Sequence, residues 1–299
     1  MDTALQLRIV ADNGDALTKK EISHLLRDSE LVLRLTSEFQ PKPLYAIWRI
    51  VALAEIPHSY TLDYTKGVVE YIERHLATES GFTLTGKAAD LLPCYNAMLL
   101  EAYSKLGISR LDSARNSLKW ILGFQPFERG IPSVWTGRGV QKYGGCLKRT
   151  PCFLGIAKSV KALAYYAESI GWGDSNVNAL IEKGLEYVLT HRLYKRLSNG
   201  EPINAHMLDI SFPASYQLNV VELLDLARLT SKLADERCSD ALQYVRSKRL
   251  SSGAWKNDYS YKADGYLTFD RRGKEGEWIS YVLGRICGAF NSESKGLTT

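Results

Sequence analysis

The 299-residue chain lacks several features that would assign it to a class at once. No stretch approaches eighteen consecutive apolar residues, so we expect no transmembrane helix. Residues 1–20 contain no apolar core followed by a cleavage site, so we also expect no secretory signal. The chain has no P-loop, no Rossmann glycine pattern and no Gly-x-Ser-x-Gly motif at a place where a strand would support it. The common nucleotide-binding and serine-hydrolase motifs are therefore not represented.

Cysteine is scarce, and its count is odd. The five cysteines are Cys94, Cys146, Cys152, Cys238 and Cys287. An odd number in a chain of this length is typical of thiols in a reducing compartment rather than of a disulfide framework. We therefore predict a cytoplasmic protein.

Acidic residues are absent from residues 129–167, although the chain carries a net charge of only +5. The basic residues of this stretch are Arg129, Arg138, Lys142, Lys148, Arg149, Lys158 and Lys161. Such a local positive field attracts anions such as a diphosphate, a carboxylate or an acidic protein partner. A solvated basic face is an equally good interpretation. Nucleic acid is not expected, because no helix-turn-helix, zinc-finger or aromatic RNP pattern accompanies the charge.

A repeated helix start is the main architectural signal. Four apolar segments open with a proline followed within three residues by an aromatic, and a fifth opens without proline. These starts are Pro43 to Tyr45, Pro93 to Tyr95, Pro151 to Phe153, Pro213 to Tyr216 and Gly276 to Trp278. They lie roughly 50 to 63 residues apart, which is enough for a helical hairpin and a long loop. Proline suits the first helical position, where its missing N–H would have had no partner.

The helices that follow these starts are apolar around most of their circumference, which is typical of helices buried on all sides. Amphipathic segments precede them, at 19–37, 63–76, 112–124, 176–191 and 236–250. This alternation predicts an all-α fold, an α/α toroid of about five helical hairpins with an inner and an outer helix ring. We expect a single toroid domain over 1–290 and a flexible tail over 291–299.

The repeat, together with Gly253-Ala254-Trp255 after an outer helix, resembles the α/α-toroid superfamily of terpenoid cyclases and protein prenyltransferase β-subunits. Three further segments are similar to a poorly characterised prokaryotic subgroup: 146–152, 191–194 and 211–213. The resemblance implies a central cavity that accepts an isoprenoid. The chain has no Asp-x-Asp-Asp or Asp-Asp-x-x-Asp motif for the two known cyclase chemistries, and no matched Asp-x-Cys for a prenyltransferase zinc site.

Cys152 is the first candidate for chemistry, because the start of a helix favours a thiolate. Cys146 and His206 could join it as ligands of a zinc ion, with His191 as a further ligand. Alternatively, Cys152 would act as a nucleophile with His206 as base and Asp209 beside it. The other interpretation is that Cys152 and Cys94 are small buried residues that fill equivalent places.

Two substrate-binding groups accompany this candidate. Arg138, Lys148 and Arg149 lead into the helix at Pro151 and could hold a phosphate or diphosphate, unless they simply point to water. Tyr95, Tyr216 and Trp278 lie on the expected inner helices. Aromatic rings there could line a cavity for an isoprenoid chain or a carbocation, or else pack into a closed core.

Together these patterns predict a prenyltransferase-like or terpenoid cyclase-like protein that binds a hydrophobic anionic substrate, such as an isoprenoid diphosphate, in the toroid cavity. The alternative is a non-catalytic binding or scaffold protein that retains the fold. In both cases we expect the protein to bind a small hydrophobic or anionic ligand. Both interpretations are also compatible with a protein partner.

Overall fold

The prediction of an all-α protein is confirmed. The structure is a computed structural model that describes residues 1–139 and 150–296, with side chains through 288. Within these residues it has 12 helices and is 54% helical, with only short strands. No helix in this part of the chain is long and apolar enough to cross a membrane.

Five helices of largely apolar sequence follow one another through the molecule, and the first four of them are mostly buried. They are α4 (Pro43–Leu53), α6 (Pro93–Lys105), α9 (Phe153–Ser169), α11 (Val220–Leu229) and α13 (Glu277–Gly296). Each contacts the next in chain order. In α4 every residue from Tyr45 to Leu53 is buried, as the apolar sequence predicts.

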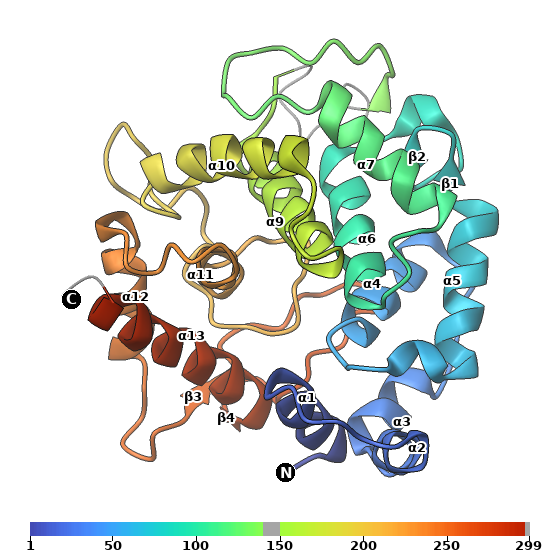
Figure 1. Cartoon of the computed structure of the whole chain (residues 1–299), viewed down its shortest axis with the longest axis vertical. Helices are drawn as coiled ribbons and strands as arrows, with labels where there is room; N and C mark the ends of the chain where they lie inside the picture. Colours follow the sequence, from blue (N-terminus) through green and yellow to red (C-terminus); the bar gives the residue numbers. More distant parts are fainter. Residues whose placement is uncertain (140–149, 297–299) are drawn as a thin grey trace.

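Four amphipathic helices lie outside this set: α5 (Asp63–His75), α7 (Asp112–Phe124), α10 (Ser175–Thr190) and α12 (Ser239–Ser247). Figure 1 shows α4, α6, α9 and α11 nearer the centre and these four toward the periphery. Each packs against the buried helix that precedes it in the chain. In the described residues each amphipathic helix therefore packs on the helix before it, whereas the sequence placed each amphipathic segment ahead of a buried one.

The N-terminal helices fill the space between α4 and α13. They are α1 (Thr3–Asp12), α2 (Lys19–Arg27) and α3 (Glu30–Thr36). Helix α1 was not expected from the sequence, and the single segment expected over 19–37 is two helices, each with its own cap at Thr18 and Ser29. Leucines of α1 and α3 form a second apolar cluster with α4, Phe269 and Trp278. Figure 1 places α1 next to the beginning of α13, so the first and last helices of the chain are neighbours.

Two of the expected helix starts are wrong in detail. Helix α11 begins at Val220 rather than near Pro213, because Asn219 provides the cap by accepting a hydrogen bond from the Glu222 N–H at 3.0 Å. Helix α9 begins at Phe153 with Cys152 as its N-cap residue. The starts at Pro43, Pro93 and Glu277 are confirmed.

Two pairs of short strands lie in the segments that connect the helices. Strands β1 (Ala77–Thr78) and β2 (Gly81–Phe82) pair antiparallel, as do β3 (Trp255–Lys256) and β4 (Glu275–Gly276). The connection between β3 and β4 packs onto α4. There Tyr261 and Tyr266 lie edge-on against Trp48, with ring centroids at 5.3 and 6.0 Å.

Gly265 makes this packing possible. Its φ is +85°, and a Cβ atom there would lie 2.6 Å from the Tyr45 Cα. We expect Gly265→Ala to lower the free energy of unfolding by about 2–3 kcal/mol, because the left-handed backbone and the clash both oppose a side chain. Gly273→Ala is the matched control: Gly273 also has a positive φ (+74°) but faces open space. Equal midpoints in urea denaturation for the two variants would contradict the close approach.

Candidate functional site

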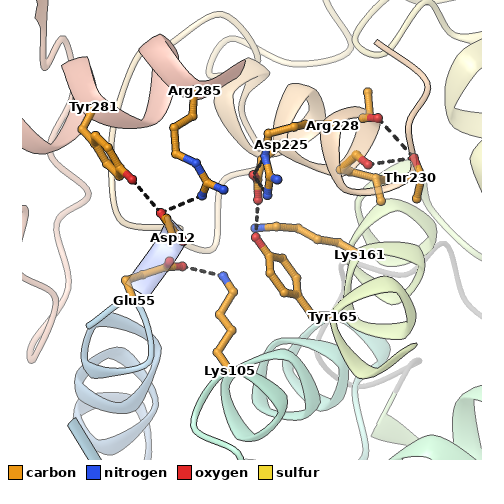
Figure 2. A network of polar contacts seen from close by, with 12 residues as sticks. Asp12, Glu55, Lys105, Lys161, Tyr165, Asp225, Arg228, Thr230, Tyr281 and Arg285 are labelled. Atoms are coloured by element: carbon orange, nitrogen blue, oxygen red, sulfur yellow. Dashed lines mark hydrogen bonds and ion pairs between the residues drawn. The ribbon is translucent and has the colours of Figure 1, made fainter. Parts of the chain in front are cut away.

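The most unusual feature of the interior is a network of buried charges among the central helices. Eleven charged side chains take part: Arg8, Asp12, Glu55, Glu101, Lys105, Lys158, Lys161, Glu222, Asp225, Arg228 and Arg285. They come from α1, α4, α6, α9, α11 and α13, or directly follow one of these helices. Figure 2 shows several of them, among them Asp12, Lys161 and Asp225, converging on one region from different elements. Their formal sum is six cations against five anions, or +1.

Lys161 occupies the middle of this network. Its Nζ lies 3.1 Å from Glu101 and 3.2 Å from Glu222, and its side chain is only 4% exposed. Burial alone would lower the pKa of Lys161, but the two carboxylates raise it well above its usual value. Lys161 is therefore a permanently charged link between α6 and α11.

Glu101 is held in its ionised form by two lysines. Lys105 lies at 2.6 Å and Lys161 at 3.1 Å. Burial raises the pKa of Glu101, but attraction to these lysines outweighs it and lowers the pKa to about 2. Lys105 also contacts Glu55 at 2.6 Å, so it links the end of α6 to the end of α4.

A second group of charges extends from α11 to α9. The Tyr165 hydroxyl donates a short hydrogen bond to Asp225, whose other carboxylate oxygen accepts from Arg228 at 2.9 Å. Burial raises the pKa of Asp225, but attraction to Arg228 and Lys161 lowers it well below its usual range. Asp225 is therefore ionised. Figure 2 shows its carboxylate close to Tyr165 and Arg228.

The third group joins the first and last helices of the chain, α1 and α13. Asp12 accepts from Arg8 at 2.8 Å, from Arg285 at 2.7 Å and from the Tyr281 hydroxyl at 2.9 Å. Arg8 also donates to the Glu55 carbonyl at 3.1 Å. These contacts fix α1 against both α13 and the end of α4.

A small cavity lies between these groups. Its charged lining consists of Arg8, Glu55, Lys161, Glu222, Asp225, Arg228 and Arg285. Phe212, Ala214, Val221 and Val282 form an apolar wall beside them. The space open to water measures about 30 Å³, enough for about two water molecules.

One carboxylate oxygen at this cavity has no hydrogen-bond partner among the described residues. Glu222 Oε2 accepts from Lys158 at 3.3 Å and Lys161 at 3.2 Å. Glu222 Oε1 is buried and makes no hydrogen bond within the described residues. An unsatisfied buried acceptor is costly, so this atom is a place where a ligand or an ordered water would donate.

The residues expected from the sequence to form the site are dispersed. Arg138 is paired with the buried Asp90 at 3.4 Å. Tyr95 packs against Trp48 and Tyr216, with ring centroids at 6.2 and 5.6 Å. Trp278 is buried against Phe212 and Phe269. These aromatics pack on one another and do not line the charged cavity. Cys146, Lys148 and Arg149 lie outside the described residues.

The expected thiol site is divided between two places. His206 Nδ1 lies 2.8 Å from Asp209 Oδ2. The centroids of the His206 and Tyr259 rings are 4.6 Å apart, and the two rings are tilted against each other. Cys152 instead lines a second cavity, separate from the charged one, together with His191. In the part of the chain that the structure describes, no three His, Cys, Asp or Glu side chains are placed to hold a metal ion.

The charge network was missed at the sequence level, although a signal was present. Glu101 and Lys105, Lys158 and Lys161, and Glu222 and Asp225 stand one turn apart on helices that are otherwise apolar. A charge at a buried position requires a partner. Such pairs on successive buried helices therefore predict a shared internal network.

Comparison with models of known protein families gives no match, and neither does comparison with curated protein sequences.

Proposed function

We propose that the chain is an α/α toroid related to the terpenoid cyclases and prenyltransferase β-subunits, and that it binds a small anionic ligand in the charged cavity at its axis. The order of the buried helices supports the ring arrangement. The combination of apolar and arginine side chains in one lining supports an anion that carries a short hydrophobic part.

The observation that carries the proposal is the unpartnered Glu222 Oε1 at a cavity whose lining has four cations and three anions. Buried ion pairs add little net stability, so a network of eleven charges around a cavity favours a functional role. A ligand would place its anionic group near Arg285 and Arg228 and a hydroxyl or ammonium group against Glu222.

Arg285 is the best residue for a test, because it lies at the rim and its only ion pair within the described residues is with Asp12. We expect Arg285→Met to weaken the binding of inorganic diphosphate about tenfold or more, the loss of one charge-assisted contact. Isothermal titration calorimetry measures this change. Arg271→Met is the control, since Arg271 is exposed on the β3–β4 connection.

Geranyl diphosphate and geraniol distinguish the two parts of the ligand. Tighter binding of geranyl diphosphate than of inorganic diphosphate would support a hydrophobic anionic substrate. Either diphosphate is larger than two water molecules, so the cavity would have to open to admit it. Equal binding of both diphosphates would restrict the site to the anionic group. If neither diphosphate binds, the proposal is wrong and the alternative of a scaffold protein gains.

A further inference from the structure

A second and larger cavity lies where α9 begins and α10 ends. Cys152, Phe153, Tyr187 and His191 line its inner part, and Arg129, Arg196, Leu197, Ser198 and Ile203 line the rest. The space open to water is about 480 Å³. None of these residues belongs to the charge network, so this is a separate place in the molecule.

His191 lines this cavity and has one ring nitrogen without a partner among the described residues. Its Nδ1 lies 2.7 Å from the Lys195 carbonyl oxygen. A carbonyl only accepts, so Nδ1 carries the proton and Nε2 carries a lone pair. Nε2 is buried without a hydrogen bond within the described residues, and the whole residue is 5% exposed. Burial also lowers the pKa of His191, which keeps the imidazole neutral.

Cys152 reaches the same cavity from the start of α9. The Gly155 N–H donates to its Sγ at 3.3 Å, and α9 extends for 17 residues. Unpaired N–H groups and the helix dipole at this end favour a thiolate. The ring of the next residue, Phe153, lies 5.1 Å from the His191 ring, so the first turn of α9 packs directly against the imidazole.

Tyr187 supplies a third polar group. Its ring lies 4.9 Å from that of His191, and its hydroxyl is buried without a partner in the described part of the chain. Such a hydroxyl could donate to an oxyanion. Arg129 and Arg196, both exposed, give the lining positive charge, which selects for an anionic ligand.

We propose that Cys152 and His191 form a thiol–imidazole site that accepts an acyl group from a small anionic acyl donor. The Cys152 thiol gives its proton to His191 Nε2, and Sγ bonds to the carbonyl carbon of the donor. Tyr187 donates to the oxygen as negative charge develops there. With an acyl phosphate, the carbon–oxygen bond to phosphate then breaks, and phosphate leaves with the proton from His191. The products are a Cys152 thioester and inorganic phosphate.

Acetyl phosphate is the probe, and intact-protein mass spectrometry with peptide mapping is the readout. We expect one hydroxylamine-sensitive acetyl group on Cys152 and its loss in Cys152→Ser. His191→Gln should slow acetylation about 100-fold, and Tyr187→Phe about tenfold or more. Cys94 is the internal control, because it is 3% exposed and burial raises the pKa of its thiol to about 12.

The rate of alkylation by iodoacetamide gives a second measurement on the unaltered protein. If His191 accepts the thiol proton, the Cys152 rate stays high at neutral pH and falls only below the ordinary imidazole pKa of about 6.5. The proposal is overturned if acetyl phosphate leaves no thioester on Cys152. It is also overturned if Cys152 is alkylated no faster than Cys94, or if its rate rises only near the ordinary thiol pKa of about 8.5.

Discussion

Replacing Lys161 with methionine is expected to lower the free energy of unfolding by about 3–5 kcal/mol, the cost of breaking a buried ion pair by removing one partner. Lys161 contacts both Glu101 and Glu222 and is 4% exposed. Methionine has a similar length, so the variant removes the charge without leaving a large cavity. The loss of stability then measures the cost of leaving the buried carboxylates of Glu101 and Glu222 with one cation fewer each.

Arg74→Met is the matched control for this measurement. Arg74 pairs with Glu70 at 2.7 Å, but both side chains are about two-thirds exposed, and exposed pairs contribute about 0–1 kcal/mol. Urea denaturation followed by circular dichroism compares the two variants. Equal losses would mean that the charges around Lys161 are hydrated, contrary to the buried network described above.

Acidification is expected to remove a comparable amount of stability. The pKa of Glu101 is lowered from 4.5 to about 2 in the folded protein. The unfolded chain therefore binds more protons than the folded one between these values, and stability rises with pH across that window. The contribution of Glu101 is complete above about pH 4.5 and is lost as the pH falls toward 2. A shift of this size corresponds to about 3 kcal/mol.

The Glu101→Gln variant separates the contribution of Glu101 to the pH dependence of stability from that of the other titratable groups. The variant is less stable at neutral pH, but its free energy of unfolding should change less between pH 4.5 and pH 2 than that of the unaltered protein. Stability should still depend on pH to some extent in both proteins, because the pKa of Asp225 is also lowered. Identical slopes for the two proteins would show that Glu101 is not held ionised by Lys105 and Lys161.

The sequence predicts the helices of this fold well, because their signal is local. The apolar segments after Pro43 and Pro93 and the amphipathic helices α5, α7 and α10 follow directly from residue periodicity. The start of α11 was misplaced because Pro213 was given more weight than the cap at Asn219. Helix α1 was missed because its pattern is weak, and its place between α4 and α13 depends on contacts distant in sequence.

The candidate sites depend on such distant contacts even more. Cys152 was identified from its place at a helix start, but the sequence offered both His206 and His191 as partners. Only the packing of α9 against α10 brings His191 into the cavity that Cys152 also lines. Lys158 and Lys161 were grouped with a basic surface, because nothing near them in sequence shows that Glu222 lies opposite.

Native mass spectrometry of the protein as purified shows whether the charged cavity binds an anionic ligand. We expect an additional small anion bound to the unaltered protein and to Arg271→Met, and its loss from Arg285→Met. An anion that stays bound to Arg285→Met with undiminished occupancy would contradict the assignment of this cavity.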